Sequence, residues 1–164
     1  MDIIMNIIVI ALIVALLTFF CSKLYNKMII NKNNATNIWA NIIKEINIRF
    51  NLIDQLNKAA AQVLDDASKS ELNRVSQNYA TKVAVEDIIN AYYDANNVIN
   101  TVMAKLNNQE WITAFNDSFN RIEALRKDYN DTILKINNSV KMFPTSIIAK
   151  IGKITPWLFF RGTE

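Results

Sequence analysis

The chain has 164 residues, 51% of them hydrophobic, and its 18 basic and 15 acidic side chains give a formal net charge of +3. This length and apolar content suffice for one folded domain and exclude a disordered chain. The sequence has no histidine and a single cysteine, which excludes a histidine-activated nucleophile, an internal disulfide and a thiolate zinc site.

The first predicted element is a transmembrane helix formed by Ile3 to Phe20, an apolar run that contains no charged residue. A helix of this length extends ~27 Å, which is enough to cross the hydrocarbon core of a bilayer. The run lacks the basic start and the small final residues of a cleaved signal peptide, so we predict an uncleaved anchor. Because Asp2 precedes the run and Lys23, Lys27 and Lys32 follow it, we expect the N-terminus outside and the C-terminal domain in the cytoplasm.

Three patterns of apolar residues spaced three or four apart predict long helices in the rest of the chain. The chain has only two glycines and two prolines to interrupt them. The second pattern is compatible with one helix or two, since residues 80–86 do not keep its phase, and the third stops where Pro144 forbids a continuing helix. The patterns comprise Trp39, Ile42, Ile46, Phe50, Ile53, Leu56, Ala60 and Val63; then Leu72, Val75, Tyr79, Val83, Ile89, Tyr92, Ile99, Val102 and Leu106; then Phe119, Ile122, Leu125, Tyr129, Ile133, Ile136, Val140 and Phe143.

Two clusters of acidic residues raise the question of a metal site. Neighbours in sequence point about 100° apart on a helix, so adjacent carboxylates do not converge on one ion. We interpret the clusters as solvated faces or caps, with Asp65 or Ser68 beginning the second helix of the body. No residue is therefore predicted to be catalytic, to bind a cofactor or to ligate a metal, and we do not expect an enzyme. The clusters are Asp65-Asp66 with Glu71, and Glu86-Asp87 with Asp94.

The C-terminal tail, residues 145–164, combines basic and aromatic side chains. No acidic residue occurs between positions 132 and 163, and Trp157, Phe159 and Phe160 add aromatic surface. This combination is typical of a surface that contacts anionic lipid or a protein partner. The alternative, which the sequence leaves open, is that these residues cap the core of the bundle. A nucleic-acid partner is not expected, because the body is acidic and has no groove-binding motif.

Two blocks of residues match the motifs of a known family. The first contains Tyr25-Asn26, Lys32-Asn33, Trp39 and the run Arg49-Phe50-Asn51-Leu52-Ile53. The second contains Asn120-Arg121-Ile122, Arg126, Tyr129-Asn130, Asn137 and Phe143-Pro144. With these blocks the chain resembles the LemA family, although Asp54 stands where the family has proline and residues 58–110 show little similarity. The resemblance implies a bacterial membrane protein with one amino-terminal span and a helical cytoplasmic domain of unassigned activity.

Four residues of these blocks are expected to have structural roles. Trp39 and Tyr129 lie on the apolar stripes, so we expect their rings in the core. Asn130 and Asn137 are expected to hydrogen-bond a neighbouring helix near Tyr25-Asn26 or Asn33 and so to fix its register.

The sequence therefore predicts an all-α protein in which a single N-terminal transmembrane helix precedes an antiparallel bundle of three or four long helices. Residues 1–22 form the anchor, residues 23–144 the LemA-like bundle and residues 145–164 the tail. We predict a scaffold or interaction module at the cytoplasmic face of the membrane, with a protein partner or self-association. The alternative function is a non-catalytic subunit of a membrane-associated enzyme, or an enzyme of that kind that uses carboxylates.

Overall fold

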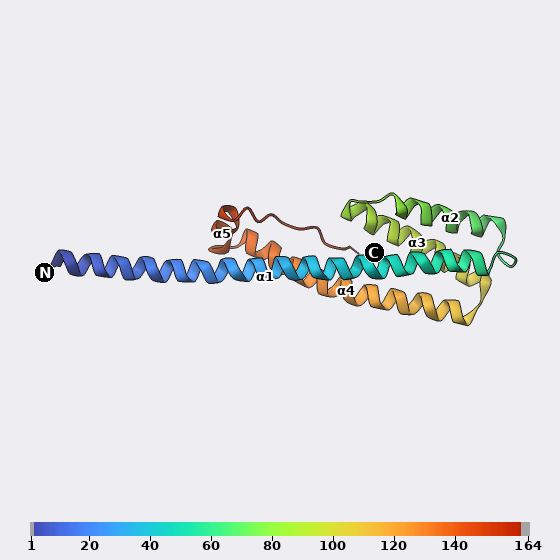
Figure 1. Ribbon diagram of the computed structural model, residues 1–164, viewed down its shortest axis with the longest axis horizontal. Coiled ribbons are helices and arrows are strands. Elements are labelled where there is room, and N and C mark those ends of the chain that lie inside the picture. The colour runs from blue at the N-terminus through green and yellow to red at the C-terminus, as the bar shows by residue number, and fades with distance from the viewer. Residues whose placement is uncertain (1, 162–164) are drawn as a thin grey trace. The chain divides into compact units, whose positions relative to one another are not determined.

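The computed structural model describes residues 2–161, and of Asp2 only the backbone (Figure 1). Met1 of the predicted anchor and residues 162–164 of the predicted tail lie outside the described residues. Residues 2–161 form five α-helices and no strand, which confirms the predicted all-α fold. The helices are α1 (Asp2–Ala59), α2 (Asp66–Ala80), α3 (Val85–Leu106), α4 (Gln109–Lys141) and α5 (Thr145–Ile151).

The apolar N-terminal run and the first predicted helix of the body are one continuous helix, α1. Neither glycine nor proline stands between them, so no residue of this stretch favours a break. α1 ends at Ala59, before the end of the apolar pattern. Val63, which we expected on the buried stripe, is 75% exposed in the following turn, because Ala60 and Leu64 take the buried positions there.

The second apolar pattern forms two helices, α2 and α3. Asp65 and not Ser68 is the N-cap of α2, and its carboxylate accepts a hydrogen bond of 2.7 Å from the backbone N–H of Ser68. Hydrogen bonds from Ser68 and then from Lys105 hold the pKa of Asp65 well below its usual range. Val83, predicted on the buried stripe, is 90% exposed because it lies in the loop between the two helices.

The third pattern forms most of α4, which ends at Lys141 just before Pro144, as predicted. Two of its predicted core residues are nevertheless exposed. Phe143 lies beyond the end of the helix, and the ring of Phe119 borders a pocket that is described below.

The chain divides into two compact units, which we describe separately. Unit 1 comprises Met1–Asn37 and Tyr129–Phe159, and unit 2 comprises Ile38–Asp128 and Phe160–Glu164. α1 and α4 therefore each contribute residues to both units.

Unit 2 is an antiparallel bundle made by the second part of α1, by α2 and α3, and by the first part of α4. Where two neighbouring helices are in contact, increasing residue numbers on one helix pair with decreasing residue numbers on the other. These helices are therefore antiparallel. The pairs are Asn57–Asn73, Asp54–Ser76 and Asn47–Tyr79 for α1 and α2, Asp65–Lys105 and Arg74–Asp94 for α2 and α3, and Glu45–Arg121 with the contact of the Arg49 side chain to the Phe115 carbonyl for α1 and α4. The largest fully buried side chains of this bundle are Ile42, Ile46, Ile53, Leu56, Leu72, Tyr92, Ile99, Ile122 and Phe160.

Unit 1 combines the first part of α1 with the end of α4, with α5 and with the extended segment that follows α5. A Cβ atom at Gly152 would lie 2.8 Å from Cε2 of Tyr25, so the glycine permits the close approach of α5 to α1. Met28, Ala35, Ile133, Ile136 and Ala149 are buried within this unit. By contrast, every residue from Ile3 to Phe20 is exposed.

Candidate functional site

Of the acidic residues that raised the question of a metal site, Asp65 is a helix cap, Glu71 and Asp94 are ion-pair partners, and Glu86 and Asp87 lie in the first turn of α3. Asp65 caps α2, whereas Glu71 and Asp94 both bind the guanidinium of Arg74. Within residues 2–161 no three Asp, Glu or Cys side chains are placed to hold a metal ion. These carboxylates therefore stabilise the bundle locally.

The most unusual side chain of unit 2 is Arg49, which projects from α1 and is only 2% exposed. Its Nε donates a hydrogen bond of 2.8 Å to Oδ1 of Asn96 on α3, and its Nη1 donates one of 2.7 Å to the carbonyl oxygen of Phe115 on α4. The guanidinium also lies 5.3 Å from the centroid of the Phe115 ring and 6.0 Å from that of Tyr92. One buried cation thus connects three helices.

Arg49 is held by neutral groups and aromatic rings, without a charged partner. It forms an ion pair with none of the described carboxylates. Burial lowers the pKa of Arg49 to about 10, so the side chain is still protonated at neutral pH. A buried charge without a counterion destabilises a fold by several kcal/mol unless hydrogen bonds compensate it. The hydrogen bonds to Asn96 and Phe115 offset part of this cost.

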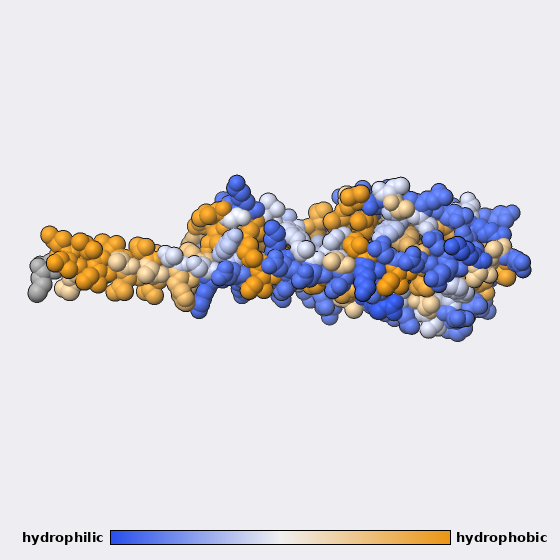
Figure 2. Space-filling model, in the orientation of Figure 1, coloured by the Kyte–Doolittle hydropathy of each residue, from blue (hydrophilic) through white to orange (hydrophobic). Residues whose placement is uncertain are grey.

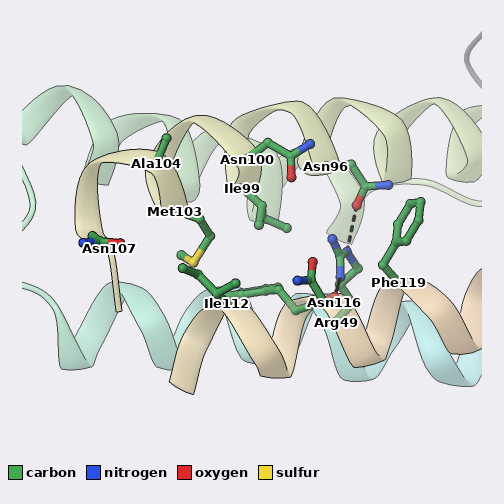
Figure 3. Close-up of a pocket in the computed structure, with 11 residues that line it drawn as sticks. Arg49, Asn96, Ile99, Asn100, Met103, Ala104, Asn107, Ile112, Asn116 and Phe119 are labelled. Atoms are coloured by element: carbon green, nitrogen blue, oxygen red, sulfur yellow. Dashed lines mark hydrogen bonds between the residues drawn. The ribbon is translucent and has the colours of Figure 1, made fainter. Parts of the chain in front are cut away.

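A pocket of about 390 Å³ lies beside Arg49, between α3 and α4 (Figure 3). Its apolar wall includes Ile99, Met103, Ile112 and Phe119. Its polar lining consists of Arg49 and the amides of Asn96, Asn100, Asn107 and Asn116. In Figure 3 Asn100 on α3 and Asn116 on α4 approach the same space from opposite walls.

The described lining of this pocket contains no carboxylate, thiol or tyrosine. It therefore offers no general acid, general base or nucleophile. In the sequence, Arg49 stood out only as part of a family motif. The signal for its burial was its place on the apolar stripe of α1, three residues after Ile46 and four before Ile53.

In unit 1 the second motif block attaches the C-terminal segment to α4. Nδ2 of Asn137 donates a hydrogen bond of 3.0 Å to the carbonyl oxygen of Trp157, and Oδ1 accepts one of 2.8 Å from the backbone N–H of Trp157. The hydroxyl of Tyr129 donates to the carbonyl oxygen of Leu158 at 3.2 Å. The expectation that Asn137 bonds the first helix was therefore wrong, because its amide pairs with the backbone of an extended segment.

The same C-terminal segment supplies Phe160, which is fully buried in unit 2. Its ring centroid lies 6.2 Å from that of Trp39, 5.8 Å from that of Tyr92 and 5.9 Å from that of Tyr93. Trp39, expected in the core, is only partly buried and meets Phe160 at an edge. The alternative role that the sequence left open for the tail, capping the core of the bundle, is therefore correct for Phe160.

A second group of C-terminal apolar residues is exposed. Phe143, Ile147 and Ile151 are 82%, 52% and 79% exposed. Ile147 and Ile151 line a shallow groove of about 450 Å³, whose other wall is formed by Cys21, Ser22 and Tyr25 of α1. α5 thus lies beside the residues that directly follow the apolar run of α1.

Comparison with protein-family models places residues 38–164 in the LemA family. This match covers more than half of the chain, from the part of α1 that carries Trp39 and Arg49 to the C-terminal segment. Comparisons with curated proteins and with solved structures gave no significant match. The chain belongs to the LemA family.

Proposed function

We propose that the protein is anchored in the membrane by residues 3–20 and that its helical body is a non-enzymatic interaction module in the cytoplasm. The observation that carries this proposal is the exposure of residues 3–20 of α1, whose large apolar side chains are 48% to 77% exposed. Figure 2 shows hydrophobic surface over this part of the helix. Exposed leucine, isoleucine and phenylalanine side chains each gain ~1.5–3 kcal/mol on full burial, so a bilayer is the natural environment of the segment.

The orientation of the anchor rests on the charges beside it. Lys23, Lys27 and Lys32 follow the span, and positive flanking residues remain in the cytoplasm. The body therefore lies in the cytoplasm, and the short leading end lies outside.

Cysteine labelling in intact cells tests this orientation. Cys21 is exposed, so it is first replaced by serine, and single cysteines are then placed at Asp2 and at Lys58, an exposed residue near the end of α1. A membrane-impermeant thiol reagent should label position 2 and leave position 58 unlabelled until the cells are permeabilised. Labelling of position 58 in intact cells would contradict the orientation.

The C-terminal surface of unit 1 contacts the same face of the membrane. It consists of Phe143, Ile147 and Ile151 with the exposed lysines Lys150 and Lys153. Figure 2 shows hydrophobic surface over α5 as well as over the start of α1. α5 lies beside Cys21 and Ser22, which directly follow the span. If residues 3–20 cross the bilayer, this surface therefore lies next to the membrane interface. Apolar and basic residues together suit the interface of an anionic leaflet.

The absence of an acid, base or nucleophile in the Arg49 pocket supports an interaction module over the alternative of a carboxylate-using enzyme. Chemical crosslinking in native membranes, followed by mass spectrometry of the purified protein, tests this part of the proposal. We expect crosslinks from exposed lysines of unit 2, such as Lys44 and Lys58, to a second copy or to another protein. Recovery of the uncrosslinked chain alone, at a crosslinker concentration that couples a known membrane complex, would contradict it.

A further inference from the structure

We infer that the pocket beside Arg49 binds a small organic carboxylate, with the carboxylate on the guanidinium and an apolar body between α3 and α4. This inference concerns unit 2 alone and goes beyond the proposed anchoring and interaction functions. Arg49 has unused capacity to donate hydrogen bonds. A guanidinium has five N–H donors, and among the described residues two of its nitrogens donate, to Asn96 and to Phe115.

The charge of the site favours an anionic ligand. Among residues 2–161, no carboxylate lines the pocket or pairs with Arg49. A guanidinium binds a carboxylate through two parallel hydrogen bonds, and a partly desolvated site strengthens such a pair. Arg49 is the single cationic residue of the lining, so a monoanion matches its charge better than a phosphate dianion.

The shape and composition of the pocket suit a small organic molecule. A volume of about 390 Å³ lies in the range of small-molecule sites, and these sites are typically apolar with a few polar groups. Ile99, Met103 and Ile112 offer contact to a hydrocarbon body, while Asn100 and Asn116 offer amides at its edge (Figure 3). The pocket is also open at one side, so a ligand has a path of entry.

Calorimetric titration of the full-length protein in detergent micelles tests the inference. The probes are acetate, hexanoate and 3-phenylpropionate, each compared with its uncharged amide, and inorganic phosphate. We expect at least one longer carboxylate to bind roughly 10–100-fold more tightly than its amide, since the amide lacks the charge-assisted hydrogen bonds. Equal binding of acid and amide, tighter binding of phosphate, or no binding of any carboxylate at about 10 mM would overturn the inference.

Two variants locate the binding. Arg49→Lys keeps the charge but loses the planar pair of donors, so it should weaken carboxylate binding at least about tenfold. Arg121→Lys is the control, because Arg121 is an exposed arginine of the same bundle that pairs with Glu45 outside the pocket. Undiminished binding by a folded Arg49→Lys variant would overturn the assignment to Arg49. If that variant does not fold, the chemical shift of the Arg49 Nε–H group is followed in the unchanged protein during titration with a carboxylate. A chemical shift that stays constant would also overturn the assignment of the binding site to Arg49.

Discussion

Replacing Phe160 with alanine should lower the free energy of unfolding of the protein by ~3–5 kcal/mol, the range for removing a buried aromatic ring. Phe160 is fully buried and its ring packs against Trp39, Tyr92 and Tyr93. Those three residues belong to α1 and α3, so the ring joins the end of the chain to two helices of unit 2. For a chain of this size the melting temperature should fall by about 10 °C, which thermal unfolding followed by circular dichroism would measure.

Leu158→Ala is the matched control for this experiment. Leu158 lies two residues earlier in the same extended segment and is 60% exposed. Its contact with Tyr129 uses the backbone carbonyl oxygen, which the substitution retains. We expect a loss within about 0.5 kcal/mol, the usual range for an exposed site. Equal melting temperatures for the two variants would show that Phe160 is not a core residue.

A fragment of the protein that lacks residues 1–23 should bind anionic vesicles at low salt and dissociate from them at high salt. Each lysine beside an anionic leaflet contributes ~1 kcal/mol, so Lys150 and Lys153 together correspond to a roughly 30-fold change in partition. The apolar side chains of Ile147 and Ile151, which are exposed in unit 1, add binding when they enter the interface. Flotation with neutral and anionic vesicles at low and high salt measures both contributions, and circular dichroism of the same sample should show a helical protein.

A pair of double variants separates this surface from exposed apolar residues in general. Ile147→Gln with Ile151→Gln should reduce flotation about tenfold or more, because two interfacial side chains are lost. Val63→Gln with Val83→Gln removes two apolar side chains that are 75% and 90% exposed in the loops of unit 2, and it should float like the parent. Equal flotation of both double variants and the parent would exclude α5 as the membrane contact.

The helices were predictable because helix formation depends on neighbours three and four residues away. The apolar period predicted the buried positions Ile42, Ile46, Ile53 and Leu56 of α1, and Pro144 predicted the end of α4. The same period could not show where α1 ends, since no glycine or proline marks Ala59. Val63 lies three residues after Ala60 and Val83 lies four residues after Tyr79, so their local spacing resembled that of a helix. Both residues lie between helices in the structure, which is why the sequence misplaced them.

The sequence by itself determined the apolar run of residues 3–20, the helical content and the family motifs, because each depends on residues close together in the chain. Only the tertiary structure decided that Asn137 pairs with the backbone of Trp157, that Arg49 reaches Asn96 and Phe115, and that α5 lies beside the end of the apolar run. These contacts join residues from 20 to more than 100 positions apart. Which distant groups satisfy a buried amide or guanidinium depends on how the helices pack, and the local spacing of apolar residues does not contain that information.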